Sequence, residues 1–187
     1  MKRRIEVVEY DRNWPARFKA EASQLALVFE HSVINIHHIG STAVPGLAAK
    51  PTIDILIEVK VGTPVSEYYE AMRQLGYECR GECLDAVIPG IPGRYYFPKI
   101  VDGQHVTHVH VCHEGHHQIA ELLGLRDYLR SHASEREAYG VHKGRLAEKF
   151  TYNNIAYMKG KDELVKKLIE RAMQWKAQQE RASYALA

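Results

Sequence analysis

Residues 52–59, with the sequence TIDILIEV, constrain the fold of this chain more than any other segment. β-Branched residues dominate the segment and favour an extended backbone, because a branched Cβ packs well on a pleated surface. Side chains alternate between the two faces of a strand. One face is wholly apolar and consists of Ile53, Ile55, Ile57 and Val59. The segment therefore predicts a buried strand that carries an acid, Asp54, on the face opposite this apolar one.

Segments on either side of this strand supply helices and further strands. Asn13-Trp14-Pro15 begins a helical pattern, since Asn caps a helix and Pro fits its first turn. The apolar residues of that pattern recur at helical spacing and are Phe18, Ala22, Leu25 and Phe29. Turn residues and periodicity then predict strands over 32–39 and 77–82, a helix over 63–76, and loops over 40–50 and 84–93.

A two-residue turn, Asp102-Gly103, predicts a hairpin between residues 95–101 and 104–112. Pairing of the residues that flank the turn sets the register along both strands. That register places two pairs opposite each other, Tyr95 with His110 and Phe97 with His108. Pro98 has no backbone N–H to donate, so we expect it on an edge strand or at a bulge.

The chain after His117 is predicted to be helical to its end. One helix covers 119–130, and a second begins at the capping-box pattern Ser134-x-x-Glu137. A third helix carries an apolar stripe that consists of Leu164, Leu168, Ala172 and Trp175. Together these elements predict one α/β (α+β) domain over 1–187, a mixed sheet with a helical C-terminal third.

Charge and hydropathy exclude several classes of protein. The 187 residues include 25 Lys and Arg and 23 Asp and Glu, a net charge of +2, so we expect no broad nucleic-acid or membrane surface. No apolar run reaches bilayer length, and no signal-peptide pattern follows the basic start. The three cysteines, Cys79, Cys83 and Cys112, form no even framework, which predicts reduced thiols in a cytoplasmic protein.

The first candidate site is the segment His38-Ile39-Gly40-Ser41-Thr42, where a predicted strand enters a loop. Backbone amides and two hydroxyls in such a turn are able to cradle a phosphate. Asp54 follows on the next strand, and a Gly-Ser turn at this spacing from a strand-borne acid is typical of the nucleotidyltransferase superfold. The alternative is an ordinary turn beside a solvated acid, because the tripeptide Gly-Ser-Thr is common in turns.

The second candidate is Thr107-His108-Val109-His110, which places two imidazoles on one strand face, about 7 Å apart. Such a pair is able to bind a metal, contact a phosphate or transfer protons. The alternative is an aromatic cluster with the facing strand.

Three further motifs favour structural roles. His113-Glu114-Gly115-His116-His117 matches the zinc-protease pattern H-E-x-x-H, but that chemistry needs a helix, and here the motif follows a strand and contains Gly115. We expect a polar connection there, with adventitious zinc binding the only metal role. Arg94 is able to pair with a phosphate or serve as an edge-strand charge. The segment 126–130 predicts ion pairs on a helix surface.

Residues 38–55, HIGSTAVPGLAAKPTIDI, resemble the signature of the GrpB-like family. Shorter segments resemble other parts of that family and occur at 10–15, 93–97, 108–111 and 125–130. The resemblance implies the nucleotidyltransferase fold with appended helices and an activity that is poorly defined. It assigns Gly40 and Ser41 to the phosphate-binding turn and Asp54 to the first acid of the strand.

This chain departs from the superfamily pattern two residues after Asp54. Active members carry a second acid there, whereas this chain has Leu56, which cannot ligate a metal. Glu58 shares the face but lies about 13 Å from Asp54, too far for a close carboxylate pair. The resemblance further suggests that the His108–His110 strand stands where the superfamily keeps its third acid. In that case Asp54, His108 and His110 form a single metal or proton-transfer site of two histidines and one carboxylate, for Zn²⁺ or Mn²⁺ more than Mg²⁺.

Two functions follow from these residues. The first is binding of a nucleotide or phosphate ester, with metal-dependent nucleotidyl or phosphoryl transfer as the implied activity. Asp54, His108 and His110 would be catalytic, and the predicted phosphate-binding residues are His38, Gly40, Ser41, Thr42, Lys50, Arg94 and Tyr95. The second is a catalytically silent ligand-binding or protein-interaction module, which Leu56 favours.

Overall fold

The computed structural model describes residues 4–82 and 90–185. Cys83 and most of the loop predicted for 84–93 lie outside the described residues, whereas Cys79 and Cys112 are free thiols as predicted. The elements are α1 (Trp14–Val28), β1 (Val33–Ile39), η1 (Ser41–Ala43), β2 (Ile53–Val59), η2 (Val65–Tyr68), α2 (Tyr69–Gln74), β3 (Arg94–Val101), β4 (Gln104–His113), α3 (His117–Ser131), α4 (Ala133–Lys149) and α5 (Asn154–Ala185).

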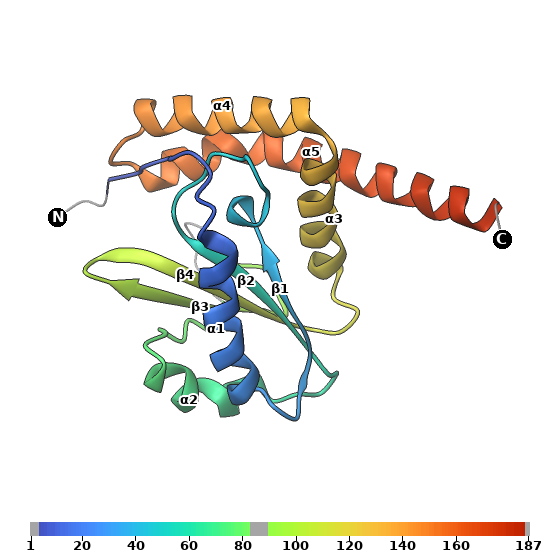
Figure 1. Cartoon of the computed structure of the whole chain (residues 1–187). Helices are drawn as coiled ribbons and strands as arrows, with labels where there is room; N and C mark the ends of the chain where they lie inside the picture. The colour runs from blue at the N-terminus through green and yellow to red at the C-terminus, as the bar shows by residue number, and fades with distance from the viewer. Residues whose placement is uncertain (1–3, 83–89, 186–187) are drawn as a thin grey trace.

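The four strands form one mixed sheet in the order β1-β2-β4-β3 (Figure 1). The central pair, β2 and β4, is parallel, and each outer strand runs antiparallel to its neighbour. The predicted mixed sheet and the helical C-terminal third are therefore both confirmed. β3 is an edge strand, so Pro98 lies where a missing N–H is tolerated.

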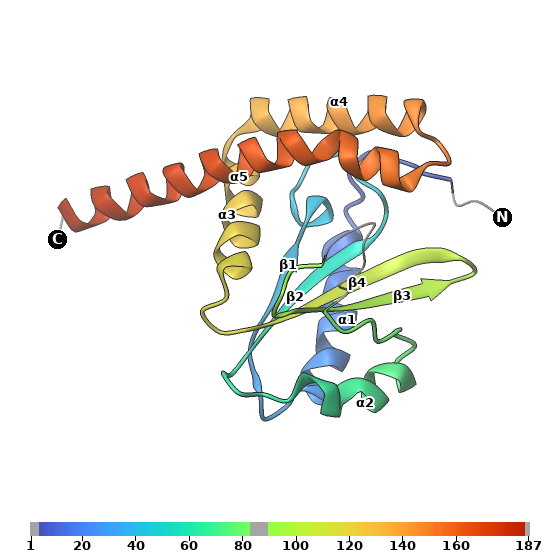
Figure 2. The same cartoon turned by 180° about the vertical axis from the view of Figure 1, so that it is seen from behind.

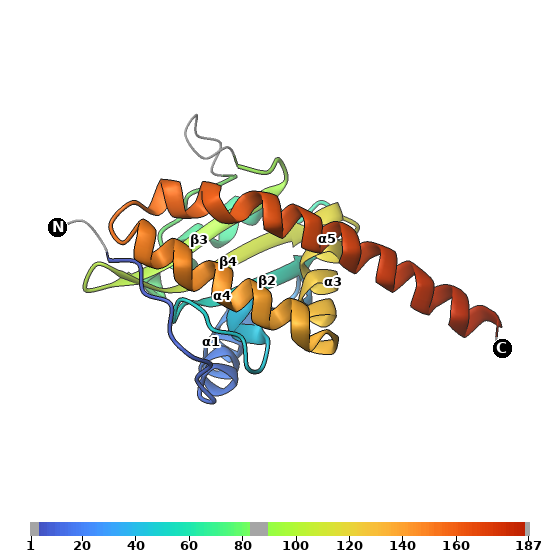
Figure 3. The same cartoon turned by 90° about the horizontal axis from the view of Figure 1, so that it is seen from above.

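The two faces of the sheet are covered by different helices (Figures 1 and 2). The predicted apolar face of β2 packs with Trp14 and Phe29 around α1 and with Met72 of α2 in the largest core cluster. On the opposite face, Leu56 packs under Ile119 of α3. Seen from above, α4 and α5 lie across this second face, and the C-terminal part of α5 projects beyond the sheet (Figure 3). Among the described helices, none combines the length and apolar character that a bilayer crossing requires.

The register predicted for the hairpin is wrong over most of its length. Val101 pairs with Gln104 as expected, but the register shifts between Lys99 and Ile100, where Val106 is an extra residue on β4. A bulge of this kind moves every later side chain by one position on one strand. As a result Tyr96 pairs with His110 and Pro98 with His108.

Other differences concern element boundaries. The helix predicted over 63–76 is a short 3-10 segment followed by α2, which ends at Gln74. Residues 77–82 run beside β3 through an isolated bridge of Tyr77 to Lys99 and through backbone hydrogen bonds from Glu78 to Pro98 and from Arg80 to Tyr96, but they do not form the predicted regular strand. α4 begins at Ala133, a strong helix former, so Ser134 is inside the helix and does not cap it.

Candidate functional site

A cavity of about 530 Å³ lies between the β2–β4 face and helices α4 and α5. Residues from the η1 loop, both central strands, β3 and the two helices line it. Its charged lining is unbalanced, because among the residues that the structure describes five basic side chains face two acidic ones. The basic residues are Lys50, Arg80, Arg94, Lys143 and Lys161, and the acidic ones are Asp54 and Glu82.

Gly40 packs directly against the carboxylate of Asp54. Its backbone, with φ 68° and ψ −169°, is accessible almost only to glycine. A Cβ at this position would lie 2.5 Å from Oδ2 of Asp54. The turn therefore requires glycine both for its backbone conformation and for its close approach to the acid. This close approach joins the two parts of the predicted motif, the Gly-Ser turn and Asp54.

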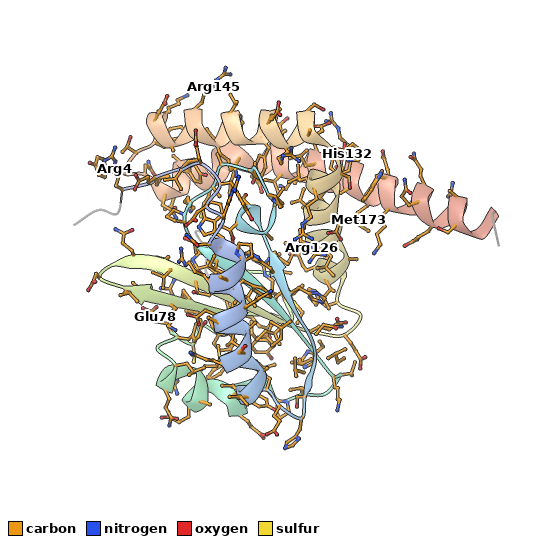
Figure 4. All side chains as sticks on the ribbon, in the orientation of Figure 1. Arg4, Glu78, Arg126, His132, Arg145 and Met173 are labelled. Atoms are coloured by element: carbon orange, nitrogen blue, oxygen red, sulfur yellow. The ribbon has the colours of Figure 1, made fainter. Side chains whose placement is uncertain are left out.

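Two arginines of α3 hold this turn from outside the cavity. Arg126, labelled in Figure 4, donates to the carbonyl of His38 at 3.2 Å. Arg130 donates to the carbonyl of Ala43 through Nε at 3.0 Å and Nη2 at 2.8 Å. Both also bond Asp127, so the predicted helix-surface ion pairs exist, and the same guanidinium groups fix the turn.

Lys143 of α4 contacts the turn from the cavity side, and only 3% of it is exposed. Its ammonium donates to Oγ of Ser41 at 2.8 Å and to the carbonyl of Ala48, and it lies over the ring of Tyr139. Burial lowers the pKa of Lys143 to about 7, the Lys161 charge lowers it further, and Asp54 opposes the shift. A buried ammonium at a Gly-Ser turn is a strong attractor for an anionic group.

Asp54, His108 and His105 form a hydrogen-bonded chain along the cavity wall. Nδ1 of His108 lies 3.0 Å from Oδ1 of Asp54 and donates to it, while its Nε2 lies 2.9 Å from Nδ1 of His105. Burial alone would raise the pKa of Asp54, but the hydrogen bond and charge of His108 lower it below its ordinary value. Asp54 is therefore held ionised and orients the His108 ring.

His110 occupies a different environment from its strand partner His108. Its ring stacks on Tyr96 with centroids 5.2 Å apart, and its buried Nδ1 has no hydrogen-bond partner. Burial and the nearby Arg94 charge lower the pKa of His110 to about 3. The ring is neutral at physiological pH, and it offers a bound molecule an unsatisfied nitrogen.

Leu56 closes the sheet surface where the superfamily pattern has its second acid. The side chain is fully buried and packs with Ile39, Cys112 and Ile119 beneath α3. This apolar cluster leaves no water-accessible space for a carboxylate and its metal. The paired-acid arrangement for Mg²⁺ therefore does not fit these residues.

The structure does not test the predicted metal site of Asp54, His108 and His110, although these residues are not arranged as a ready set of ligands. Within residues 4–82 and 90–185, no group of three or more His, Cys, Asp or Glu side chains is placed to hold a metal ion. Both nitrogens of His108 are engaged in hydrogen bonds, which a metal would have to displace. Metal binding by Asp54, His108 and His110 stays a hypothesis for metal analysis.

Most of the residues predicted from the sequence meet at this cavity. Those lining it are Ser41, Thr42, Lys50, Asp54, Arg94, His108 and His110. His38 does not line it, because the ring points to the other face, where it stacks on Phe18 and bonds Oγ1 of Thr42 at 3.0 Å. Burial lowers the pKa of His38 to about 4, so the ring supports the turn as a neutral group. Tyr95 is likewise turned away, toward the core cluster.

Sequence reasoning missed several lining residues. Tyr96 replaces Tyr95 because the Val106 bulge shifts the register, and no local pattern announces that bulge. Lys143, Tyr157 and Lys161 come from helices whose packing on the sheet is a tertiary property. Lys143 in particular stands among exposed charges of α4, and only its burial distinguishes it.

The H-E-x-x-H segment forms the expected polar connection between strand and helix. His113 ends β4, with its Nε2 2.9 Å from the carbonyl of Thr63. His116 caps α3 by accepting from the backbone N–H of Gln118 at 3.2 Å. The segment is not helical, and the partners of its histidines are part of the fold.

Comparisons with known proteins identify the relatives of this chain. A family model described as GrpB protein matches residues 4–171. The UPF0157 protein YqkA of Bacillus subtilis is 41% identical over 175 residues, which are 94% of this chain and 49% of YqkA. This chain thus spans about half the length of that relative.

Solved structures support the same relationship and define the fold. The crystal structure of the conserved protein GrpB from Enterococcus faecalis is 33% identical, has a TM-score of 0.83, and covers 90% of this chain and 98% of that one. The Cid1 poly(U) polymerase with Mg 3′-dATP bound is 13% identical, with a TM-score of 0.50 over 75% of this chain and 44% of that chain. The fold is therefore nucleotidyltransferase-like, and at this identity the likeness to Cid1 concerns the fold alone.

Proposed function

Since this chain belongs to the GrpB family and has a nucleotidyltransferase-like fold, we propose that its cavity binds a nucleotide or another small phosphate ester. One observation carries the proposal. The Gly40–Ser41–Thr42 turn, the buried ammonium of Lys143 and Asp54 converge on a cavity whose basic side chains outnumber its acidic ones. Its volume of about 530 Å³ is in the range of small-molecule sites.

The parts of the cavity suit different parts of such a ligand. Hydroxyls of Ser41 and Thr42 and the ammonium of Lys143 are hydrogen-bond donors to phosphate oxygens. Tyr96, which is half-buried, provides aromatic surface for a base or another planar group. Lys50 and Lys161, both within 6 Å of the Tyr157 ring centroid, add positive charge near the middle of the cavity.

Transfer of a nucleotidyl or phosphoryl group is a second candidate, and one observation favours it. The Asp54–His108 hydrogen bond orients an imidazole as a general base is oriented in many enzymes. Against it stands Leu56, which replaces the second acid of active superfamily members. Binding is therefore the proposed function, and transfer is tested alongside it.

Thermal unfolding with a panel of ligands tests the proposal. The panel contains nucleoside mono-, di- and triphosphates, a sugar phosphate and inorganic pyrophosphate. A ligand of the native state raises Tm with concentration, and at a hundred times its Kd it adds about 2.7 kcal/mol to the unfolding free energy. Ser41→Ala should remove the shift, whereas the exposed Ser183→Ala should keep it. A flat response to every compound would refute the proposal.

Product analysis of the same mixtures tests transfer. Release of phosphate or pyrophosphate that disappears in Asp54→Asn would support it. Binding with no turnover would leave the ligand-binding function alone.

A further inference from the structure

We infer that the cavity binds its phosphate ester without a divalent cation, and that the Lys143 ammonium supplies the positive charge a metal ion would otherwise supply. The inference rests on the proposed function and restricts the ligand to an anion that binds without a metal ion. Three features of the site support it.

The first feature is that the β2 strand offers only one carboxylate beside the turn, that of Asp54, and that one of its oxygens is already hydrogen-bonded. Oδ1 accepts the hydrogen bond from His108, and Oδ2 faces Gly40 so closely that even a Cβ would be 2.5 Å away. One oxygen of the carboxylate is thus already engaged by the protein, and the other lies beside the Gly40 turn. The next acidic position along the strand is Leu56, which is buried under α3. A divalent ion would find a single carboxylate on this strand face beside the turn, with one of its oxygens already hydrogen-bonded.

The second feature is the charge of the surroundings. The charges of Lys161 and Lys50 both act on Lys143 and disfavour its protonated form. Among the described residues, the lining has five basic and two acidic side chains. Because like charges repel strongly where water is largely excluded, this environment disfavours a doubly charged cation and favours a polyanion.

The third feature is the isolation of the Lys143 charge. Within the described residues its hydrogen bonds go to the Ser41 hydroxyl and the Ala48 carbonyl, and it forms no ion pair. A buried cation without a counterion is energetically costly. A phosphate beside Ser41 would complete the pair, and it would also favour the protonated form of Lys143, whose pKa burial lowers to about 7. Binding at pH 8 should therefore take up a proton.

Calorimetric titration of the full chain with inorganic pyrophosphate and with ATP tests the inference. Each titration is done in EDTA and again in millimolar Mg²⁺. We expect the affinity in EDTA to equal or exceed that in Mg²⁺, because the metal neutralises part of the ligand's charge. An affinity tenfold or more higher with Mg²⁺ would overturn the inference and leave the proposed function intact. Absence of binding in both conditions would overturn the inference and count against the proposed function.

Two variants assign the role to Lys143. Lys143→Met should weaken binding at least tenfold and abolish the proton uptake measured at pH 8 in buffers of different ionisation enthalpy. Lys159→Met, an exposed lysine on α5, is the matched control and should change neither quantity. Proton uptake that persists in folded Lys143→Met would contradict the assignment. If that variant fails to fold, the EDTA and Mg²⁺ titrations of the unmodified chain still decide the main inference.

Metal analysis of chain purified without a His-tag gives an independent check. We expect less than stoichiometric zinc or manganese. A stoichiometric ion lost in Asp54→Ala would instead support the site predicted from Asp54, His108 and His110 and overturn the inference.

Discussion

Single residues at the cavity are constrained by their neighbours more than by their own chemistry. Gly40 shows this best, because its backbone conformation and its approach to Asp54 both exclude a side chain. Lys143 is the converse case, a side chain whose charge is kept in place by two hydrogen bonds at a position almost sealed from water. Both residues can be tested through stability, without knowledge of the ligand.

Gly40→Ala should lower the free energy of unfolding by about 3 kcal/mol or more, because strained backbone and steric overlap with Asp54 add together. The control is Gly62→Ala, which also has positive φ but no atom within 4 Å of the new Cβ. It should cost about 1–2 kcal/mol. Urea denaturation measures both losses, and equal losses would show that contact with Asp54 is unimportant.

Lys143 should make the free energy of unfolding increase with pH above about 7. The pKa of Lys143 is about 7 in the folded chain and near 10.5 in the unfolded chain, so between these pH values only the unfolded state holds the proton. The unfolding free energy therefore rises with pH above 7 through this residue. Below 7 both states hold the proton, so the cost of burying the ammonium is constant and at its full value. Asp54 opposes the shift, whereas Lys161 and Lys50 reinforce it.

The test compares the unfolding free energies of Lys143→Met and the unmodified chain at several pH values. Where the variant is more stable at pH 6, the difference in unfolding free energy should decrease as the pH rises from 7 to 9, by at most about 1.4 kcal/mol per pH unit. Denaturation curves at four pH values provide the test, with Lys159→Met as control. Parallel stability profiles would mean that the Lys143 amine titrates normally.

At the scale of elements, α3 determines which residues on the Asp54 face of β2 reach the cavity. It covers Leu56 with Ile119, Leu122 and Leu123, so only the Asp54 end of that strand face reaches the cavity. The same helix holds the η1 turn through Arg126 and Arg130. One element therefore both buries the second acidic position and positions the turn.

Leu56→Asp restores the acid of the superfamily pattern and should destabilise the chain by more than about 4 kcal/mol, since it buries a carboxylate in an apolar cluster. We expect no gain of Mg²⁺ binding. The control is Leu27→Asp at a side chain that is 77% exposed, with an expected change of about 0.5 kcal/mol or less. Thermal unfolding compares the two, and a stable Leu56→Asp variant that binds Mg²⁺ would show that α3 does not close this position.

For the whole molecule, the fold could be predicted because its signals are local and mutually consistent. The alternation in 52–59, the Asp102-Gly103 turn and the 38–55 signature all point to one mixed sheet, and the family model agrees. The hairpin register could not be predicted from the sequence, because the bulge at Val106 has no recognisable sequence pattern.

The site was predictable only where its residues lie on that sheet or its first loop. Asp54 and His108 share a face because they are paired across neighbouring parallel strands, and Ser41 lies in the turn that follows β1. Lys143 joins them from a helix about a hundred residues away, and no spacing rule connects the two segments. The cavity is completed by tertiary packing, which periodicity does not report.

The cationic lining has a consequence for the speed of encounter. A pocket that presents five basic groups attracts anions over roughly the Debye length, about 10 Å at 0.1 M salt. Association with pyrophosphate should therefore slow markedly between 20 and 300 mM NaCl, while the dissociation rate, set by short contacts with Ser41 and Lys143, should change little. Because α3 and α4 already hold the turn in place, stopped-flow traces should show a single phase, without a slow step for loop rearrangement.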